Sequence, residues 1–217
     1  LRKMLKAPIV LPNGDVTYPT KGTPQGGILS PLLANINLNE FDWWIANQWE
    51  SKKCRTINDY FIKSTGLYSH QYRYKQLRKT STLKEMYIVR YADDFKIFTT
   101  SRANAKKIFM ASKMWLEERL GLSISEEKSQ ITNLKKKSSE FLGFDLKMER
   151  KGYDRVGNKK FVCQSHITEK ARKRIKDQLK NQIKVIQHAP TGTELIKQLQ
   201  VYNSMVIGIH NYYQIAT

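Results

Sequence analysis

The chain lacks the features that would place it in a membrane or in an oxidising compartment. Only two of its 217 residues are cysteines, Cys54 and Cys163. Two cysteines so far apart provide neither a disulfide framework nor a zinc-binding motif, which favours a reducing compartment. No apolar run approaches the ~20 residues that span a bilayer, and no signal peptide opens the sequence. We therefore expect a soluble intracellular protein with no membrane partner.

Acidic residues are scarce relative to basic ones. The chain has 38 Lys and Arg against 19 Asp and Glu, which gives a net charge of +19. This surplus favours binding to a polyanion, because contacts with phosphates release condensed counterions. On charge alone, an acidic membrane surface is the competing partner. The length allows one or two domains, each with a real core.

Two adjacent carboxylates stand out against this basic background. Asp93 and Asp94 lie between residues 86–90 and 95–99, two short runs rich in β-branched and aromatic residues. These runs predict antiparallel strands joined by a two-residue turn at Asp93 and Asp94. Adjacent carboxylates repel each other, so this pair favours a bound divalent cation such as Mg²⁺, together with phosphate oxygens. Taken alone, the pair fits a solvated Asp-Asp turn equally well.

A glycine-rich segment precedes a predicted helix. Residues 21–29 contain Pro-Gln-Gly-Gly, after which Ser30 provides a helix cap and Pro31 a first-turn residue. Glycines allow close approach of the backbone to a ligand, and the free amides at a helix start favour an anion. An ordinary Gly-Pro turn is the alternative. Further upstream, Asn13 and Gly14 separate two apolar runs and predict a hairpin.

Periodicity predicts the remaining elements. Ser101 caps a helix that Gly121 ends, and alternation from Leu122 to Ile131 predicts a strand-turn-strand that carries Lys128. A hairpin that turns near residues 151–158 comes next. A helix from Thr168 then ends at Pro190. A second helix from Thr193 and a third that contains Met205 would complete a small bundle.

The order of these segments resembles a known protein family. Residues 21–36, followed by Arg90–Phe95, resemble the palm of reverse transcriptases, most closely those encoded by bacterial group II introns. Later segments resemble further blocks of that family and its thumb (domain X), in the family's order: residues 120–129, residues 141–145, Tyr202–Ser204 and Asn211–Tyr213. The ordered set is far more specific than any single motif.

The resemblance implies an α+β fold. Residues 1–164 would form the palm, an antiparallel sheet with packed helices, and residues 165–217 an α-helical thumb. The family's metal site also needs an aspartate from an earlier strand, whereas the opening hairpin carries only Asp15. We therefore expect the fingers and the first catalytic strand to be missing. Because the chain begins at Leu1, we expect it to be a piece of a longer enzyme and inactive alone.

The resemblance also implies roles for individual residues. Asp93 and Asp94 would be catalytic and would bind two Mg²⁺ ions, roughly 4 Å apart, that activate the primer hydroxyl and stabilise the leaving pyrophosphate. Lys128 would be catalytic by neutralising or protonating that pyrophosphate. Without the resemblance, Lys128 beside two glutamates predicts a surface ion pair. Nucleotide-binding residues would be Gln25, Gly26, Tyr91 and Ala92, and primer-binding residues would be Leu142 and Gly143.

Two basic stretches predict RNA contacts. Residues 50–85 interleave Lys and Arg with Tyr and Phe, so basic groups can meet phosphates while rings stack on bases. The candidates there are Arg73 and Lys75. The helix that begins after Thr168 has an apolar stripe and basic remaining faces, with Arg172, Lys173 and Lys176 as candidates. The alternatives are a mobile solvated loop and a solvated helix face, respectively.

The function implied by the resemblance is RNA-directed DNA synthesis. The protein would copy intron RNA into cDNA and assist group II intron splicing and mobility, in the cytoplasm of a bacterium. Its partners would be group II intron RNA, an RNA template with a DNA primer, and deoxynucleoside triphosphates, with homodimer formation left open. One alternative is a non-catalytic RNA-binding splicing cofactor with a relict palm. A palm-type nucleotide cyclase is another, but it would need neither the thumb nor the Pro-Gln-Gly loop.

Overall fold

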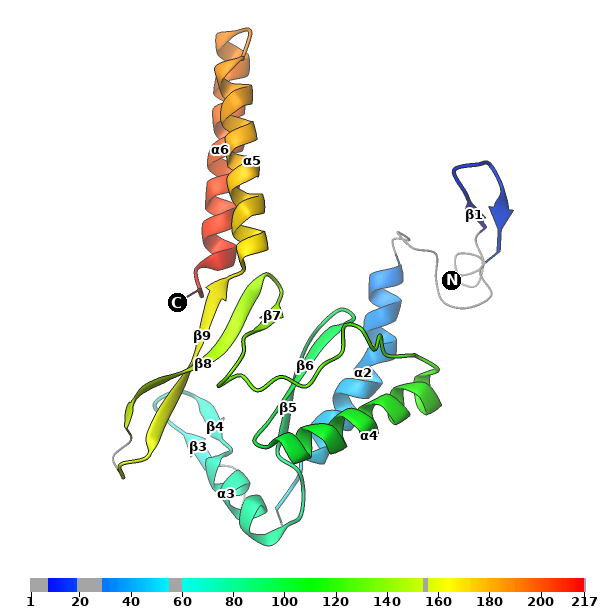
Figure 1. Ribbon diagram of the computed structural model, residues 1–217, viewed down its shortest axis with the longest axis vertical. Coiled ribbons are helices and arrows are strands. Elements are labelled where there is room, and N and C mark those ends of the chain that lie inside the picture. The colour runs from blue at the N-terminus through cyan, green and yellow to red at the C-terminus, as the bar shows by residue number, and fades with distance from the viewer. Residues whose placement is uncertain (1–7, 19–28, 55–59, 154–155, 217) are drawn as a thin grey trace. The chain divides into compact units, whose positions relative to one another are not determined.

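The computed structural model describes residues 8–18, 29–54, 60–153 and 156–216 (Figure 1). The chain divides into two compact units, Leu1–Ile131 and Thr132–Thr217. Both units mix helices with antiparallel strands, as expected of an α+β fold. The predicted boundary between residues 164 and 165 falls within the second unit and stays a prediction. Gln25 and Gly26 lie outside the described residues.

The first unit contains three helices and three hairpins among its described residues. The hairpin predicted at Asn13 and Gly14 is confirmed, and Gly14 carries the positive φ of 87° that its turn needs. The elements are β1 (Ile9–Val10), β2 (Val16–Thr17), α2 (Ser30–Gln48), β3 (Tyr60–Ile62), β4 (Leu67–Ser69), α3 (Gln71–Thr80), β5 (Met86–Tyr91), β6 (Asp94–Thr99) and α4 (Arg102–Leu120).

The core of this unit forms where α2 and α4 pack on the β5–β6 hairpin. Phe41 and Ile45 of α2 are completely buried and lie four residues apart, on one face of the helix. The Phe41 ring lies 5.2 Å from the Phe95 ring of β6 and 5.5 Å from the Trp115 ring of α4, measured between centroids. Helix α2 is therefore a rigid support beneath the hairpin.

Capping residues explain where the helices begin and end. Ser101 Oγ accepts a hydrogen bond from the Asn104 amide at 3.1 Å, and Gly121 ends α4 with φ of 63°, so both predictions are confirmed. The predicted Ser30 cap is wrong by one position, because Ser30 is already the first residue of α2 and Leu29 precedes it without a side-chain cap. Pro31 suits that first turn, since it has no amide hydrogen that needs an acceptor.

The predicted strand-turn-strand after α4 is wrong. Described residues 121–138 contain no strand, and the Ser129 amide closes a turn onto the Ser125 carbonyl at 3.0 Å. Leu122 and Ile124 pack against the core of the first unit. Their alternation therefore reflects burial of an extended segment that has no partner strand.

The second unit is a three-stranded antiparallel sheet followed by a helical hairpin. Its elements are β7 (Ser139–Phe141), β8 (Phe144–Tyr153), β9 (Lys159–Ile167), α5 (Glu169–Gln187) and α6 (Gly192–Tyr213). The β8–β9 hairpin confirms the prediction for this region. Thr168 caps α5, since its Oγ1 accepts a hydrogen bond from the Ala171 amide at 3.2 Å.

Helices α5 and α6 lie side by side and run in opposite directions (Figure 1). The prediction of separate second and third helices is wrong, because α6 continues from Gly192 to Tyr213. Gly208 is the only glycine or proline in the interior of that helix, and one interior glycine is tolerated. A hydrogen bond of 2.8 Å from Gln182 Nε2 to Gln198 Oε1 joins the two helices. No described helix is both long and apolar enough to cross a membrane.

Candidate active site

The aspartate pair lies at the tip of the β5–β6 hairpin. Tyr91 of β5 pairs with Asp94 of β6, which leaves Ala92 and Asp93 as the two turn residues. The predicted turn at Asp93 and Asp94 is thus wrong by one residue, because Asp94 takes the first ladder position of β6. Ala92 carries the positive φ of 53°. That conformation costs a residue with a Cβ atom about 1–2 kcal/mol.

Both carboxylates are available to a ligand. Asp93 and Asp94 are exposed, and within the described residues neither carboxylate has a hydrogen bond or an ion pair. Tyr91, which is 65% exposed, lies directly opposite Asp94 and therefore shares its face of the hairpin. Exposed oxygen ligands suit a hard divalent cation. The described residues contain no group of three His, Cys, Asp or Glu side chains that could hold a metal, so these two carboxylates form an incomplete ligand set.

Arg90 connects this turn to helix α2. Its Nε and Nη2 donate to the two carboxylate oxygens of Asp42 at 2.9 and 2.6 Å. Its Nη1 donates to Asn35 Oδ1 at 2.9 Å and to the Ala92 carbonyl at 2.6 Å. The Arg90 side chain is only 11% exposed. Its pKa is raised above the usual arginine value, mainly by the hydrogen bond with Asp42.

Sequence reasoning missed this cluster. Its signal was an arginine within the otherwise apolar and aromatic run of β5, next to the residues of the turn. Asp42 and Arg90 are 48 residues apart in the sequence, so no local pattern pairs them. Beside the cluster lies an open hollow of about 360 Å³, to which Trp43, Ile88 and Arg90 contribute.

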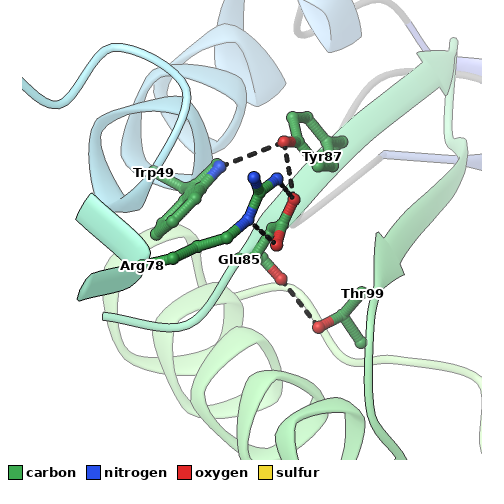
Figure 2. Close-up of polar contacts among 5 residues, drawn as sticks. All are labelled: Trp49, Arg78, Glu85, Tyr87 and Thr99. Carbon is green, nitrogen blue, oxygen red and sulfur yellow. Dashed lines mark hydrogen bonds and ion pairs between the residues drawn. The ribbon is translucent and has the colours of Figure 1, made fainter. Parts of the chain in front are cut away.

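A second cluster fixes the other end of β5 (Figure 2). Arg78 Nε and Nη2 donate to the Glu85 carboxylate at 2.9 and 2.5 Å, and the Tyr87 hydroxyl donates to the same carboxylate at 2.9 Å. Trp49 Nε1 donates to the Tyr87 hydroxyl at 3.2 Å, and Thr99 Oγ1 to the Glu85 carbonyl at 2.7 Å. The hydrogen bond from Arg78 holds the pKa of Glu85 below its usual value.

Lys128 lies in an exposed turn of the first unit. Within the described residues it forms no ion pair with Asp93 or Asp94. Its neighbour Glu126 is held instead, by an ion pair with Lys113 of α4 at 2.8 Å. The turn that carries Lys128 is therefore tied to α4, while the role of Lys128 stays a prediction.

Leu142 and Gly143 form the two-residue turn between β7 and β8 in the second unit. Both have positive φ, 52° and 81°, as a type I′ hairpin turn requires. The Tyr212 hydroxyl donates to the Leu142 carbonyl at 2.9 Å, and the Thr168 amide donates to the Gly143 carbonyl at 3.0 Å. The Tyr213 ring also packs 5.2 Å from Phe144. These tyrosines, which sequence analysis assigned only to the thumb, thus hold the turn.

The predicted RNA-binding residues fall into two groups. Lys75 of α3 and Arg172, Lys173 and Lys176 of α5 are exposed, although Arg172 is paired with Glu169 on its own helix. Arg73 differs, because it is only 6% exposed and its Nη1 donates to the Lys52 carbonyl at 2.8 Å. This burial argues against a phosphate contact and favours a structural role for Arg73.

Comparison with known proteins identifies the family. The family described as reverse transcriptase (RNA-dependent DNA polymerase) matches residues 1–146. The group II intron-encoded protein LtrA of Lactococcus lactis subsp. cremoris is 33% identical over 179 residues, which cover 69% of this chain and 29% of LtrA. The putative COX1/OXI3 intron 2 protein of Saccharomyces cerevisiae is 31% identical over 172 residues, which cover 68% of this chain and 20% of that protein.

A further relative is the protein YkfC of Escherichia coli, which is 32% identical over 142 residues that cover 62% of this chain and 34% of YkfC. The chain spans about a fifth to a third of the length of these relatives. The family match covers more than half of the chain and includes the Ala92–Asp93 turn and Asp94. The chain therefore belongs to the reverse transcriptase family, and its similarity to group II intron-encoded proteins, which its motifs indicated, is confirmed.

Proposed function

We propose that this chain is part of an RNA-directed DNA polymerase that copies intron RNA into cDNA and assists group II intron splicing and mobility. The observation that carries the proposal is the pair of exposed carboxylates at a tight turn, which form no hydrogen bond or ion pair within the described residues and lie in the region that matches the family. Any two-residue hairpin turn needs a positive φ, so a purely structural turn would favour glycine or asparagine at position 92. Two adjacent carboxylates at such a tip are better explained by a metal ion that they hold.

Asp93 and Asp94 are the residues that would hold Mg²⁺. When bound, such ions activate the primer hydroxyl and stabilise the leaving pyrophosphate. Because two carboxylates are an incomplete set, further ligands would come from the nucleotide phosphates and from a carboxylate outside the described residues. Tyr91 and Ala92, with Gln25 and Gly26, would line the nucleotide site. Lys128 would act on the leaving group.

The remaining residues would hold the nucleic acid. The Leu142–Gly143 turn would support the primer end, since hydrogen bonds from Tyr212 and Thr168 fix both of its carbonyls. Exposed Arg172, Lys173 and Lys176 on α5, and Lys75 on α3, would contact phosphates of the template and primer or of the intron RNA. Such contacts depend on the shape of the duplex and not on its sequence.

Replacement of one aspartate tests the proposal. In the complete natural polypeptide, Asp93→Ala should abolish primer extension on an RNA template while RNA affinity in a filter-binding titration stays within about twofold, because no basic surface changes. The matched control is Glu118→Ala, which removes an exposed carboxylate from helix α4. Primer extension that survives Asp93→Ala would refute the metal assignment.

A non-catalytic splicing cofactor is the second candidate. The observation in its favour is that the described residues provide basic surfaces but no complete set of metal ligands. It predicts that the wild-type polypeptide promotes intron splicing yet shows no primer extension at any Mg²⁺ concentration. Primer extension by the wild-type polypeptide would exclude it.

A further inference from the structure

We propose that Arg90 is a positioning residue that fixes the Ala92–Asp93 turn against helix α2 and keeps both carboxylates in a single arrangement. The inference rests on the proposed function, because it assigns Arg90 a part in the reaction attributed to Asp93 and Asp94. It also makes a claim about the free protein that can be tested without any activity measurement.

The geometry uses almost the whole donor set of the guanidinium. Nε and Nη2 form a fork on Asp42, while Nη1 serves both Asn35 and the Ala92 carbonyl. Asn35 and Asp42 lie about two helical turns apart on α2, so they face the strand from the same side of the helix. That helix is anchored in the core by Phe41, which is completely buried. Arg90 thus attaches the turn to a helix that is itself anchored in the core.

The turn needs this support because its own backbone does not favour the observed conformation. Ala92 has a φ of 53°, and nothing about an alanine side chain stabilises the left-handed region. Its carbonyl accepts a charge-assisted hydrogen bond of 2.6 Å from Arg90. Loss of that bond would let the hairpin tip adopt other turn conformations and move the carboxylate of Asp93.

Asp42 has a second effect within this cluster. A guanidinium three and four residues from Asp93 and Asp94 would otherwise be an ion-pair partner for them, and such a pair would compete with a metal ion. Because Asp42 occupies the Nε and Nη2 donors, the aspartates at the tip have no ion-pair partner in the part of the chain that the structure describes. The cluster therefore both fixes the turn and keeps its carboxylates free.

The opposite end of β5 offers a matched control. Arg78, in the last turn of α3, forms the same kind of fork on Glu85, the residue just before β5 (Figure 2). Among the described residues, Arg78 has no hydrogen bond to the Ala92–Asp93 turn. Lysine keeps the charge at either position but cannot bridge several acceptors in one plane. Arg90→Lys and Arg78→Lys therefore remove equivalent forks, only one of which supports the turn.

The test compares these two variants in the complete natural polypeptide. Arg90→Lys should lower kcat for nucleotide addition by roughly 10- to 100-fold, the scale expected from misplaced catalytic groups, with KM for the template-primer within about twofold. Amide hydrogen exchange of the peptide that contains residues 91–95 should become faster in the same variant. Arg78→Lys should change neither quantity, even if it lowers the melting temperature.

Two further variants keep the test decisive if Arg90→Lys does not fold. Asn35→Ala removes a single acceptor of Nη1 and should lower kcat by a smaller factor in the same direction. In Arg90→Ala, added methylguanidinium should restore part of the lost kcat, because the adjacent hollow of about 360 Å³ gives it access to Asp42.

Other outcomes would overturn the inference. Equal losses of kcat in Arg90→Lys and Arg78→Lys would show that Arg90 contributes only to the overall stability of the fold. An unchanged rate of amide exchange at residues 91–95 in Arg90→Lys would show that the turn does not depend on Arg90. If the wild-type polypeptide shows no primer extension, the proposed function fails. The exchange comparison between the two lysine variants still decides whether Arg90 holds the turn.

Discussion

At the scale of single residues, both candidate turns, at the β5–β6 tip and at the β7–β8 tip, contain residues with positive φ angles. At the β5–β6 tip the strained residue is Ala92, whose cost is offset by Arg90. At the β7–β8 tip, Leu142 and Gly143 have φ angles of 52° and 81°, and Gly143 lies against Tyr213 of α6. No sequence pattern predicted a turn at Leu142 and Gly143, and a positive φ carried by alanine or leucine has no sequence signal.

Gly143→Ala should destabilise the second unit through two separable effects. An alanine at this positive φ should lower the free energy of unfolding by about 1–2 kcal/mol. The new Cβ atom would also lie 3.1 Å from the Tyr213 hydroxyl oxygen, and this close contact should lower it further. Gly152→Ala is the matched control, because Gly152 has a φ of 74° with nothing within 4 Å of its Cβ position. Urea unfolding should show a larger loss for Gly143→Ala.

A double-mutant cycle with Tyr213→Phe isolates the steric term. Removal of the hydroxyl should reduce the cost of Gly143→Ala toward that of Gly152→Ala, since only the contact at 3.1 Å is relieved. If the cost of Gly143→Ala is the same with phenylalanine at position 213, the tyrosine does not pack on this turn in solution.

Glu85 should make stability depend on pH. Its pKa is lowered in the folded protein below the usual value of 4.5 for a glutamate side chain, mainly by the hydrogen bond from Arg78. A depressed folded pKa contributes stability that is fully present above the unfolded pKa and is lost as pH falls through the folded value. The difference in unfolding free energy between the wild type and Glu85→Gln should therefore be constant above about pH 5.5 and shrink below pH 4.5.

Chemical denaturation at a series of pH values between about pH 3 and pH 7 would measure this dependence. In an Arg78→Gln background, the pH dependence of the Glu85→Gln effect should become smaller, because the principal cause of the shift is gone. A pH profile that Arg78→Gln leaves intact would contradict the role of the Arg78–Glu85 pair.

At the scale of elements, local patterns predicted the helices and hairpins well where one face is buried. Ser101 caps α4 and Gly121 ends it as expected, since capping is a local hydrogen-bonding effect. Patterns misled where partners are distant. Alternation at Leu122 and Ile124 reflects packing against the core and not a ladder, and the Asp94 position was set by strand register, which the turn residues alone do not fix.

Helix α5 provides a test of nucleic-acid binding. Its three candidates, Arg172, Lys173 and Lys176, are exposed, whereas Ala171 of the apolar stripe is buried and Ile175 and Leu179 are half-buried. Their joint replacement by glutamine should weaken template-primer affinity and reduce the slope of log affinity against log salt by roughly 0.7 to 0.9 for each lost phosphate contact.

The matched control removes the same charge from another helix. Arg102, Lys106 and Lys107 of α4 are also exposed, so their replacement by glutamine changes the net charge equally. If both triple variants reduce the salt slope by the same amount, only total charge matters and α5 is a solvated face. A reduction confined to the α5 variant supports a direct contact.

At the scale of the whole molecule, the family could be predicted from the sequence. The residues that hold the aspartate turn in place could not. The ordered motifs from residue 21 to residue 213 identified a reverse transcriptase similar to group II intron-encoded proteins, in agreement with the family match over residues 1–146. Arg90, Asp42 and Asn35 could not be assembled from the sequence, because hydrogen bonds between a helix and a strand 48 residues apart leave no periodic trace.

The last prediction concerns residues 1–217 on their own. Two carboxylates hold Mg²⁺ only loosely, because this ion dehydrates reluctantly and relies on further ligands, and the described residues offer no third side chain for the set. We therefore expect the isolated chain to bind RNA through its net charge of +19 but to show no measurable primer extension. The complete natural polypeptide, assayed in parallel on the same template-primer, should extend the primer. Robust extension by the 217-residue chain would instead place the third carboxylate within it, with Asp15 and Asp145 as the first positions to replace by alanine.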